Sequence, residues 1–246
     1  MLKDLLNAPG SKTPNGLPSF QLWVPQGAEY QAVRRGWHRR GLAANILALP
    51  VGSLAVTAFL TQWWQSRPVE VRPLGKIIVL GLAGSLSAEF SLGQPVLYQS
   101  CRRLGPSPSV PPAYLDAALT AFLHQQLAYP LVQGLTSDHV INQREEKMTL
   151  GQQYGRAVVD MEGIAVLAFC QAHGLPVAML RVISDDIDQA LPDLQGVYDN
   201  RGQLRPLALA GALVNQPRRG LHLIRSSLTA LQALEQVAAS LSELKF

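Results

Sequence analysis

The sequence is poor in charged residues and in cysteine. Asp, Glu, Lys and Arg make up 15% of its 246 residues, against roughly 25% in an average soluble domain. Hydrophobic residues at 48% exclude disorder, because such a chain can bury enough apolar surface to offset its ordering entropy. Cys101 and Cys170 are too few for a disulfide framework or a metal cluster, which indicates a reducing, cytoplasmic compartment.

The sequence also gives little support for a metal-binding, nucleic-acid-binding or membrane-binding protein. The five histidines have no metal-ligand spacing, so we expect no metal ion and no cofactor. A net charge of +4 spread over this length produces only a weak electrostatic field, which does not by itself indicate a nucleic-acid partner. Arginines cluster at 34–40 and again at 218–225, where they could meet RNA or an anionic lipid surface. A solvated helix face explains them better, so we expect neither nucleic acid nor membrane as a partner.

Residues 41–60 carry no charge and are numerous enough to span a bilayer. Polar residues, a proline and a glycine interrupt the run, which argues against a membrane helix. It predicts instead a strand at Asn45–Val51, a turn at Gly52, and a helix that Ser53 caps and that ends near Trp64. Residues 1–19 are rich in proline and glycine and predict a loose tail ahead of one domain at 20–246.

Strands and helices alternate along the rest of the chain. Further strands are predicted at Gln21–Val24, Lys76–Leu80, Pro95–Gln99, Leu131–Thr136 and Val177–Ile183. Further helices are predicted at Tyr114–Leu127, Met161–His173 and Leu221–Leu244, with loops at 104–112 and 190–206 and a polar stretch at 137–157. The last helix has an apolar stripe of Leu221, Ile224, Leu228, Leu231 and Leu234. The strands are continuous apolar runs, which indicates an α/β fold whose sheet is buried on both faces.

A glycine-containing segment, Gly81–Leu86, directly follows one of these strands. We expect a loop there whose backbone N–H groups, including that of Gly84, could contact a phosphate or a sugar. The segment is neither GxGxxG nor a P-loop, and a strand follows too soon for a dinucleotide fold. A sharp turn without any ligand is the alternative explanation.

Acidic residues gather at two element ends. Asp160 and Glu162 stand at the start of a predicted helix, and Asp185 and Asp186 follow Ser184 at the end of the next strand. Sites in open α/β sheets collect at the carboxyl ends of strands, so the two groups could face one crevice. Such carboxyl groups suit glycosidic chemistry, in which one protonates a leaving group and another steadies a cation. Helix-dipole and turn-capping roles are the alternative.

The residues around these acids resemble a known family. Val159–Ala165 (VDMEGIA), Gly174–Val177 (GLPV) and Leu180–Asp185 (LRVISD) resemble the nucleoside phosphorylase/nucleosidase superfamily, and most closely its 5′-methylthioadenosine/S-adenosylhomocysteine nucleosidases. Weaker likenesses lie at Gly81–Leu86 with Gly93–Val96, at Ser137–Asn142, and at Val24–Glu29. The resemblance covers about residues 21–240 and implies a single domain with a mixed sheet in a three-layer α/β/α arrangement. It also implies a homodimer.

The resemblance also implies a role for each matched residue. Asp185 would protonate the departing purine, and Glu29 would orient or deprotonate an attacking water. Glu162 would accept hydrogen bonds from both ribose hydroxyls. The remaining implied substrate contacts are Met161 on the ribose, Val140 and Ile141 against the base, Ser184 and Gly84 nearby, and Asp138 as a brace for Asp185 or the base loop.

Water is favoured over phosphate as the nucleophile. Phosphorolytic relatives carry basic residues near Val79 and near Pro25–Glu29, where this chain has none. The expected function is therefore hydrolysis of the N-glycosidic bond of a purine nucleoside or thio-nucleoside. A phosphorylase that uses Arg102 or Arg103 as its clamp is one alternative. A nucleoside-binding protein without turnover is the other, because Leu82 stands where many relatives have Ser or Thr.

Overall fold

A computed structural model describes residues 20–38, 46–68, 75–105, 111–194, 196–199 and 201–244, so the predicted tail at 1–19 lies outside the described residues. The strands are β1 (Phe20–Pro25), β2 (Ile46–Leu49), β3 (Lys76–Ser85), β4 (Pro95–Arg103), β5 (Ala113–Tyr114), β6 (Leu131–Thr136), β7 (Ala157–Asp160) and β8 (Val177–Asp185). The helices are α1 (Ala28–His38), α2 (Ser53–Gln65), α3 (Ala117–Leu127), α4 (Arg144–Tyr154), α5 (Gly163–Ala172), α6 (Pro206–Asn215) and α7 (Pro217–Leu241).

The sheet is mixed, and part of it closes on itself. β8 runs parallel to β3 on one side and antiparallel to β4 on the other, and β4 continues through β6 and β7 back to β3. The closing pairs, Gly84–Val159 and Ser85–Val158, lie at the last residues of β3. The carboxyl ends of β3, β7 and β8 therefore meet at one place, although β7 is antiparallel to β3.

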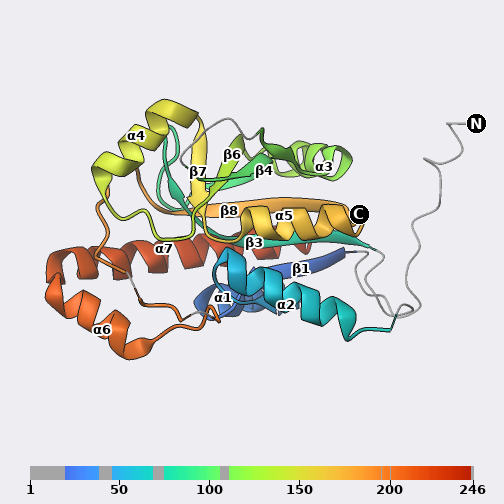
Figure 1. Cartoon of the computed structure of the whole chain (residues 1–246). Helices are drawn as coiled ribbons and strands as arrows, with labels where there is room; N and C mark the ends of the chain where they lie inside the picture. Colours follow the sequence, from blue (N-terminus) through green and yellow to red (C-terminus); the bar gives the residue numbers. More distant parts are fainter. Residues whose placement is uncertain are drawn as a thin grey trace, which may run out of the picture.

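Helices cover both faces of this sheet (Figure 1). Alternate residues of β3 point to opposite sides: Ile77 and Val79 join a core with residues of α2 and α5, whereas Ile78 and Leu80 join a core with residues of α1, α3 and α7. A smaller core lies under α4 around Leu150. The strands are thus buried on both faces, and the predicted three-layer α/β/α fold is confirmed.

Some element boundaries differ from the prediction. β3 continues to Ser85, so the expected loop at Gly81–Leu86 is wrong: these residues pair with β8 through Gly84, and their apolar side chains can be buried there. Ser53 does not cap α2, because Gly52 holds the N-cap position and the hydroxyl of Ser53 donates to the carbonyl of Met161 at 3.0 Å. Residues 113–114 form a strand, and α3 begins after them at Ala117.

Two helices, α4 and α6, and two strands, β5 and β7, were not predicted. The polar stretch 137–157 contains α4 and the first residue of β7, because α4 buries only Lys147 and Leu150 and so shows no apolar stripe. α6 has no buried residue at all. The predicted apolar stripe of α7 is only partly buried: Leu234 lies in the core and Leu231 packs against it, whereas Leu221, Ile224 and Leu228 are exposed.

The uncharged run at 41–60 is confirmed as strand, turn and helix over its described part, 46–60. Among the described residues, no helix combines the length and the apolar character that crossing a membrane requires.

Close packing between β4 and β6 yields a stability prediction. A Cβ atom on Gly134 would lie 2.1 Å from the ring of Tyr98, which is fully buried and whose hydroxyl donates to Asp160 at 3.2 Å. We expect Gly134→Ala to lower the free energy of unfolding by about 1–3 kcal/mol or more, because the ring cannot move away without losing that bond. Urea unfolding measures the change. The control is Gly211→Ala in α6, where a Cβ meets nothing within 4 Å and no loss is expected.

Candidate active site

Three carboxyl groups from separate parts of the chain face one cavity at the carboxyl ends of β3, β7 and β8. Glu29 lies in the first turn of α1, Glu162 lies between β7 and α5, and Asp185 ends β8. The closure of the sheet brings the second and third together, because Gly84 pairs with both Val159 and Asp185. Glu29 reaches them from α1 by accepting a hydrogen bond from the backbone N–H of Leu82 at 2.5 Å.

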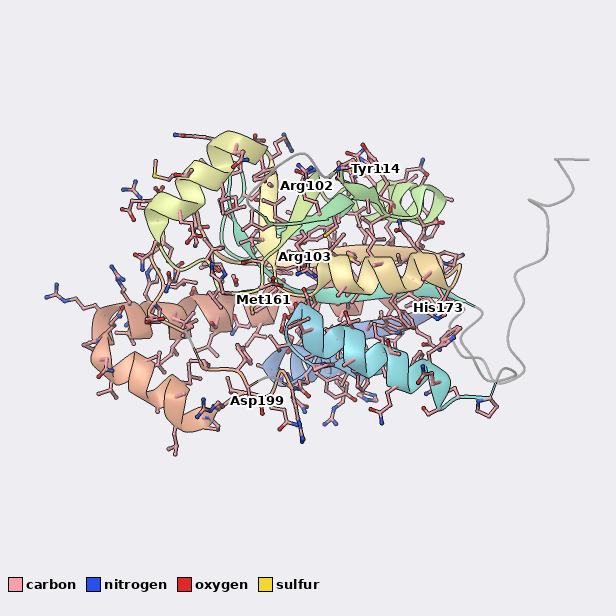
Figure 2. All side chains as sticks on the ribbon, in the orientation of Figure 1. Arg102, Arg103, Tyr114, Met161, His173 and Asp199 are labelled. Carbon is pink, nitrogen blue, oxygen red and sulfur yellow. The ribbon has the colours of Figure 1, made fainter. Side chains whose placement is uncertain are left out.

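The cavity has two chambers. The inner chamber, about 210 Å³, is lined by all three carboxyl residues together with Gly84, Val140, Ile141, Met161 and Ser184. The outer chamber, about 480 Å³, lies between the start of α2 and the segment 138–146. Val51, His139, Val140, Met161, Leu194 and Tyr198 line both. The two chambers therefore adjoin, and Met161 lies near the middle of the molecule with Asp199 of the outer chamber below it (Figure 2).

A buried ion pair lies beneath the inner chamber. The guanidinium of Arg181 donates to Asp160 Oδ2 at 3.0 and 3.2 Å, and both side chains are 1% exposed. Asp160 also accepts from the hydroxyls of Thr136 at 2.8 Å and Tyr98 at 3.2 Å, and from the backbone N–H of Gly163 at 3.1 Å. Asp160 also belongs to the lining of the inner chamber, but both of its carboxylate oxygens accept hydrogen bonds from the protein.

Burial shifts the titration of the two glutamates. It raises the pKa of Glu29 to about 7, and the hydrogen bond from Leu82 and the charge of Arg181 offset part of the effect. The pKa of Glu162 rises to about 8, through burial first and then through the charges of Asp160 and Glu29. Its Oε1 accepts from the N–H of Gly52 at 2.8 Å. Near neutral pH the empty cavity therefore holds one or both glutamates protonated.

Asp185 has a cation of its own. The ammonium group of Lys147, on α4, donates to Asp185 Oδ2 and also to the carbonyls of Asp186 and Gln189, each at 3.0 Å. Lys147 is fully buried. The hydroxyl of Ser184 donates to Asp185 Oδ1 at 2.7 Å. Both carboxyl oxygens are thus held by the protein, which fixes the side chain at the cavity wall.

The structure brings most of the predicted residues together. Glu29, Glu162, Asp185, Met161, Val140, Ile141, Ser184 and Gly84 all line the inner chamber. Asp138 does not brace Asp185: it lines only the outer chamber, where its exposed carboxylate pairs with Arg103 at 2.7 Å. Arg102 lies over the ring of Tyr154, and neither arginine lines a chamber.

Sequence reasoning missed Lys147, the start of α2 at Val51–Ser53, and Tyr198. A lysine at the buried position of a polar helix looks like a surface residue, so no local signal marked Lys147. The turn at Gly52 was predicted, but its contact with Glu162 spans 110 residues of sequence. Tyr198 lies in a segment that was predicted to be a loop.

Comparison with known families agrees with this geometry. A sequence model described as the phosphorylase superfamily matches residues 70–208, which include Glu162 and Asp185. The match covers more than half of the chain. The protein therefore belongs to the phosphorylase superfamily.

The chain also resembles individual hydrolases and nucleosidases in sequence or in fold. The chain is 29% identical to the futalosine hydrolase of Thermus thermophilus over 164 residues, which are 59% of this chain and 71% of the relative. Its fold matches the 5′-methylthioadenosine/S-adenosylhomocysteine nucleosidase of Helicobacter pylori with a TM-score of 0.63 at 15% identity, covering 93% of this chain and 99% of the other. The futalosine hydrolase of H. pylori gives a TM-score of 0.56 at 14% identity, covering 85% and 96%.

The Lys147–Asp185 pair yields a prediction on stability. We expect Lys147→Met to lower the free energy of unfolding by about 3–5 kcal/mol, because it leaves a buried carboxylate without its cation. In the double variant with Asp185→Asn the losses should fall short of additivity by about 1–3 kcal/mol. Urea unfolding of the four proteins measures this coupling.

The control is a second pair between the same segments of chain. Arg144 on α4 pairs with Asp188 at 2.8 Å, and both side chains are at least half exposed. The corresponding cycle with Arg144→Met and Asp188→Asn should give a coupling below about 1 kcal/mol. Equal coupling in the two cycles would show that the buried pair contributes no more than a surface pair.

Proposed function

We propose that the protein is a nucleosidase-type hydrolase, which cleaves the N-glycosidic bond of a purine nucleoside or thio-nucleoside with water. The observation that carries this proposal is the convergence of Glu29, Glu162 and Asp185 on the inner chamber. Heterolysis of that bond leaves positive charge on the sugar and negative charge on the base. Carboxylates can stabilise the sugar cation, and a carboxyl group can supply the proton that the base needs.

In this mechanism Glu162 binds the ribose. Its carboxyl group has one oxygen on the N–H of Gly52, and the chamber wall beside it is Met161. Burial favours the protonated form of Glu162. Hydroxyl groups that donate to a carboxylate favour its charged form, so ribose binding lowers the pKa of Glu162 and favours the carboxylate. The resulting carboxylate lies where it can stabilise an oxocarbenium-like sugar.

Asp185 serves the departing base. A proton on its carboxyl group, given to the imidazole ring of the purine, turns a poor leaving group into a neutral one. That proton enters on Asp185 from solvent and leaves with the base, which balances the proton that the attacking water releases, and the ammonium of Lys147 donates a hydrogen bond to the carboxylate that remains. Lys147 is a positioning residue in this scheme, because Asp185 lies between it and the substrate.

Glu29 activates the water. A base works best when its pKa lies near the working pH, and burial places that of Glu29 at about 7. The proton lost by the water goes to Glu29, and the oxygen bonds to the anomeric carbon as the bond to the base breaks. Glu29 then returns its proton to solvent.

Water suits this chamber better than phosphate. Phosphate binding calls for arginine or lysine side chains, and none lines either chamber in the described part of the chain. The two nearest buried cations, Arg181 and Lys147, are occupied by Asp160 and Asp185. The outer chamber leaves space for a substituent on the 5′ carbon, as in a thio-nucleoside.

The deciding experiment is incubation of the pure protein with methylthioadenosine, S-adenosylhomocysteine, adenosine, inosine and futalosine, with and without phosphate. We expect free base by chromatography at a rate that phosphate does not change. Strict dependence on phosphate would establish a phosphorylase. Calorimetric binding without base release would establish a binding protein.

Asp185→Asn tests the acid. We expect kcat to fall by about 10²–10⁴-fold, because the amide cannot supply the proton. Nucleoside binding should persist. The matched control is Asp188→Asn, an exposed carboxylate three residues away that lines neither chamber, with an unchanged rate. Full activity of Asp185→Asn would reject Asp185 as the acid.

The pH profile tests the base. Glu29 and Glu162 both act as carboxylates, so kcat/KM should rise with pH through about 7 and about 8 and level off above these values. Glu29→Gln should lose the step near 7 and about 10²-fold or more of the rate, and it should keep the step that belongs to Glu162. Glu89→Gln, on an exposed carboxylate that pairs with Arg156 at 2.6 Å, is the control. A wild-type profile in Glu29→Gln would assign water activation elsewhere.

A further inference from the structure

Helix α6 and the first half of α7 form a hairpin whose outer surface is apolar and unpartnered. We name residues 201–228 the basic hairpin. α6 contains no charged residue and no buried residue, and Leu207 and Val214, which lie on one face seven residues apart, are 89% and 77% exposed. Figure 1 shows α6 projecting below one end of α7, away from the sheet.

The first half of α7 carries exposed apolar residues as well. Leu221, Ile224 and Leu228 share one side of that helix at three- and four-residue spacing, and each is at least 46% exposed. α7 packs on the body through other residues, among them Ser226, Ala230 and Leu234. The core of the described structure therefore does not account for this stripe.

Arginines accompany the apolar residues without matching acids. The basic hairpin contains Arg201, Arg205, Arg218, Arg219 and Arg225, whereas no Asp or Glu occurs anywhere from Asn200 to Leu234. Within the described residues none of these arginines forms an ion pair with a carboxylate. Arg201 and Arg205 lie close enough to Asp199 to interact with its charge, so the charge available to an external anion is that of Arg218, Arg219 and Arg225.

The sequence alone led us to expect no membrane partner, but the exposed apolar residues beside the arginines change that expectation, and we propose that the basic hairpin docks on an anionic lipid bilayer. Leucine, valine and isoleucine side chains would enter the boundary between headgroups and acyl chains, and the arginines would contact lipid phosphates. A helix that lies in the interface needs an apolar face and flanking cations rather than a long apolar span. That distinguishes this surface from a membrane-crossing segment.

Two other occupants fit the surface less well. A second copy of the chain, related by a two-fold axis, would place the same patch against itself and bring two sets of arginines together. Nucleic acid that binds without base pairing uses aromatic side chains for stacking, and the basic hairpin contains no Phe, Tyr or Trp. The aliphatic composition favours lipid.

The docking surface adjoins the mouth of the cavity. Leu194, Gly196, Tyr198 and Asp199 line the outer chamber, and the chain then turns through a bridge between Tyr198 and Leu204 into α6. Arg205 N–H donates to the carbonyl of Val197 at 2.7 Å, which fixes this connection. Docking would therefore hold the entrance beside the bilayer surface.

Vesicle sedimentation of the full chain tests the proposal. We expect the protein to pellet with vesicles of phosphatidylcholine and phosphatidylserine, and not to pellet with vesicles of phosphatidylcholine alone. Salt at about 0.5 M, several times the physiological concentration, should release the protein because it screens the charges. Arg218→Gln with Arg219→Gln should weaken binding about thirtyfold, at about fivefold per arginine. Leu207→Asn with Val214→Asn should also weaken it.

Control variants carry equal changes elsewhere. Arg34→Gln with Arg156→Gln removes two exposed charges, and Tyr114→Asn removes an exposed apolar side chain, both outside the hairpin. They should bind like the wild type, and circular dichroism should show every variant folded. The proposal fails if no vesicle binds, or if the controls lose as much as the hairpin variants. It also fails if Leu207→Asn with Val214→Asn converts a dimer to a monomer in light scattering, or if an RNA oligonucleotide binds while vesicles do not.

Discussion

The rest of the structure depends on a guanidinium group that is buried within the sheet. Arg181 has no access to water, so Asp160 must neutralise it, and the carboxylate that does so also holds Tyr98, Thr136 and the start of α5. One ion pair therefore joins β4, β6, β7, β8 and α5 at the base of the cavity. Arg181 is paired with Asp160 and offsets only part of the effect of burial on Glu29 and Glu162, so the pKa values of both glutamates stay high.

The strands were the part of the fold that the sequence predicted best. A central strand such as Lys76–Ser85 must be apolar on both faces, and few other elements produce a short apolar run of that kind. Helices were harder to predict when their pattern was weak. α4 buries a lysine and a leucine, and α6 buries nothing, so neither shows the periodicity that packing imposes. In α7 the apolar side chains near its start face outward, whereas Leu231 and Leu234, at the end of the same predicted stripe, pack on the core.

The part of the candidate site that could be predicted consists of residues at the ends of strands that follow one another in the chain. Glu162 and Asp185 follow consecutive strands of the chain, and strand ends meet at one edge of the sheet. Glu29 was named through a family resemblance, since its contact with Leu82 crosses 53 residues. Lys147 could not be found, because a buried lysine is unusual and only the tertiary structure shows its partner. Asp138 was misplaced for the opposite reason: an acid beside the base loop suggested an inward role, but Arg103 draws it outward.

The closed part of the sheet also constrains how the molecule folds. β3 and β8 pair at Ile77 and Val177, so the ring contains a pairing between residues that are a hundred positions apart in the sequence. Pairings of such long range raise the entropic cost of the folding transition state and slow its formation. The ends of β3, β7 and β8, which carry the cavity, are joined by that same closure. The cavity is therefore absent from any intermediate in which the ring is still open.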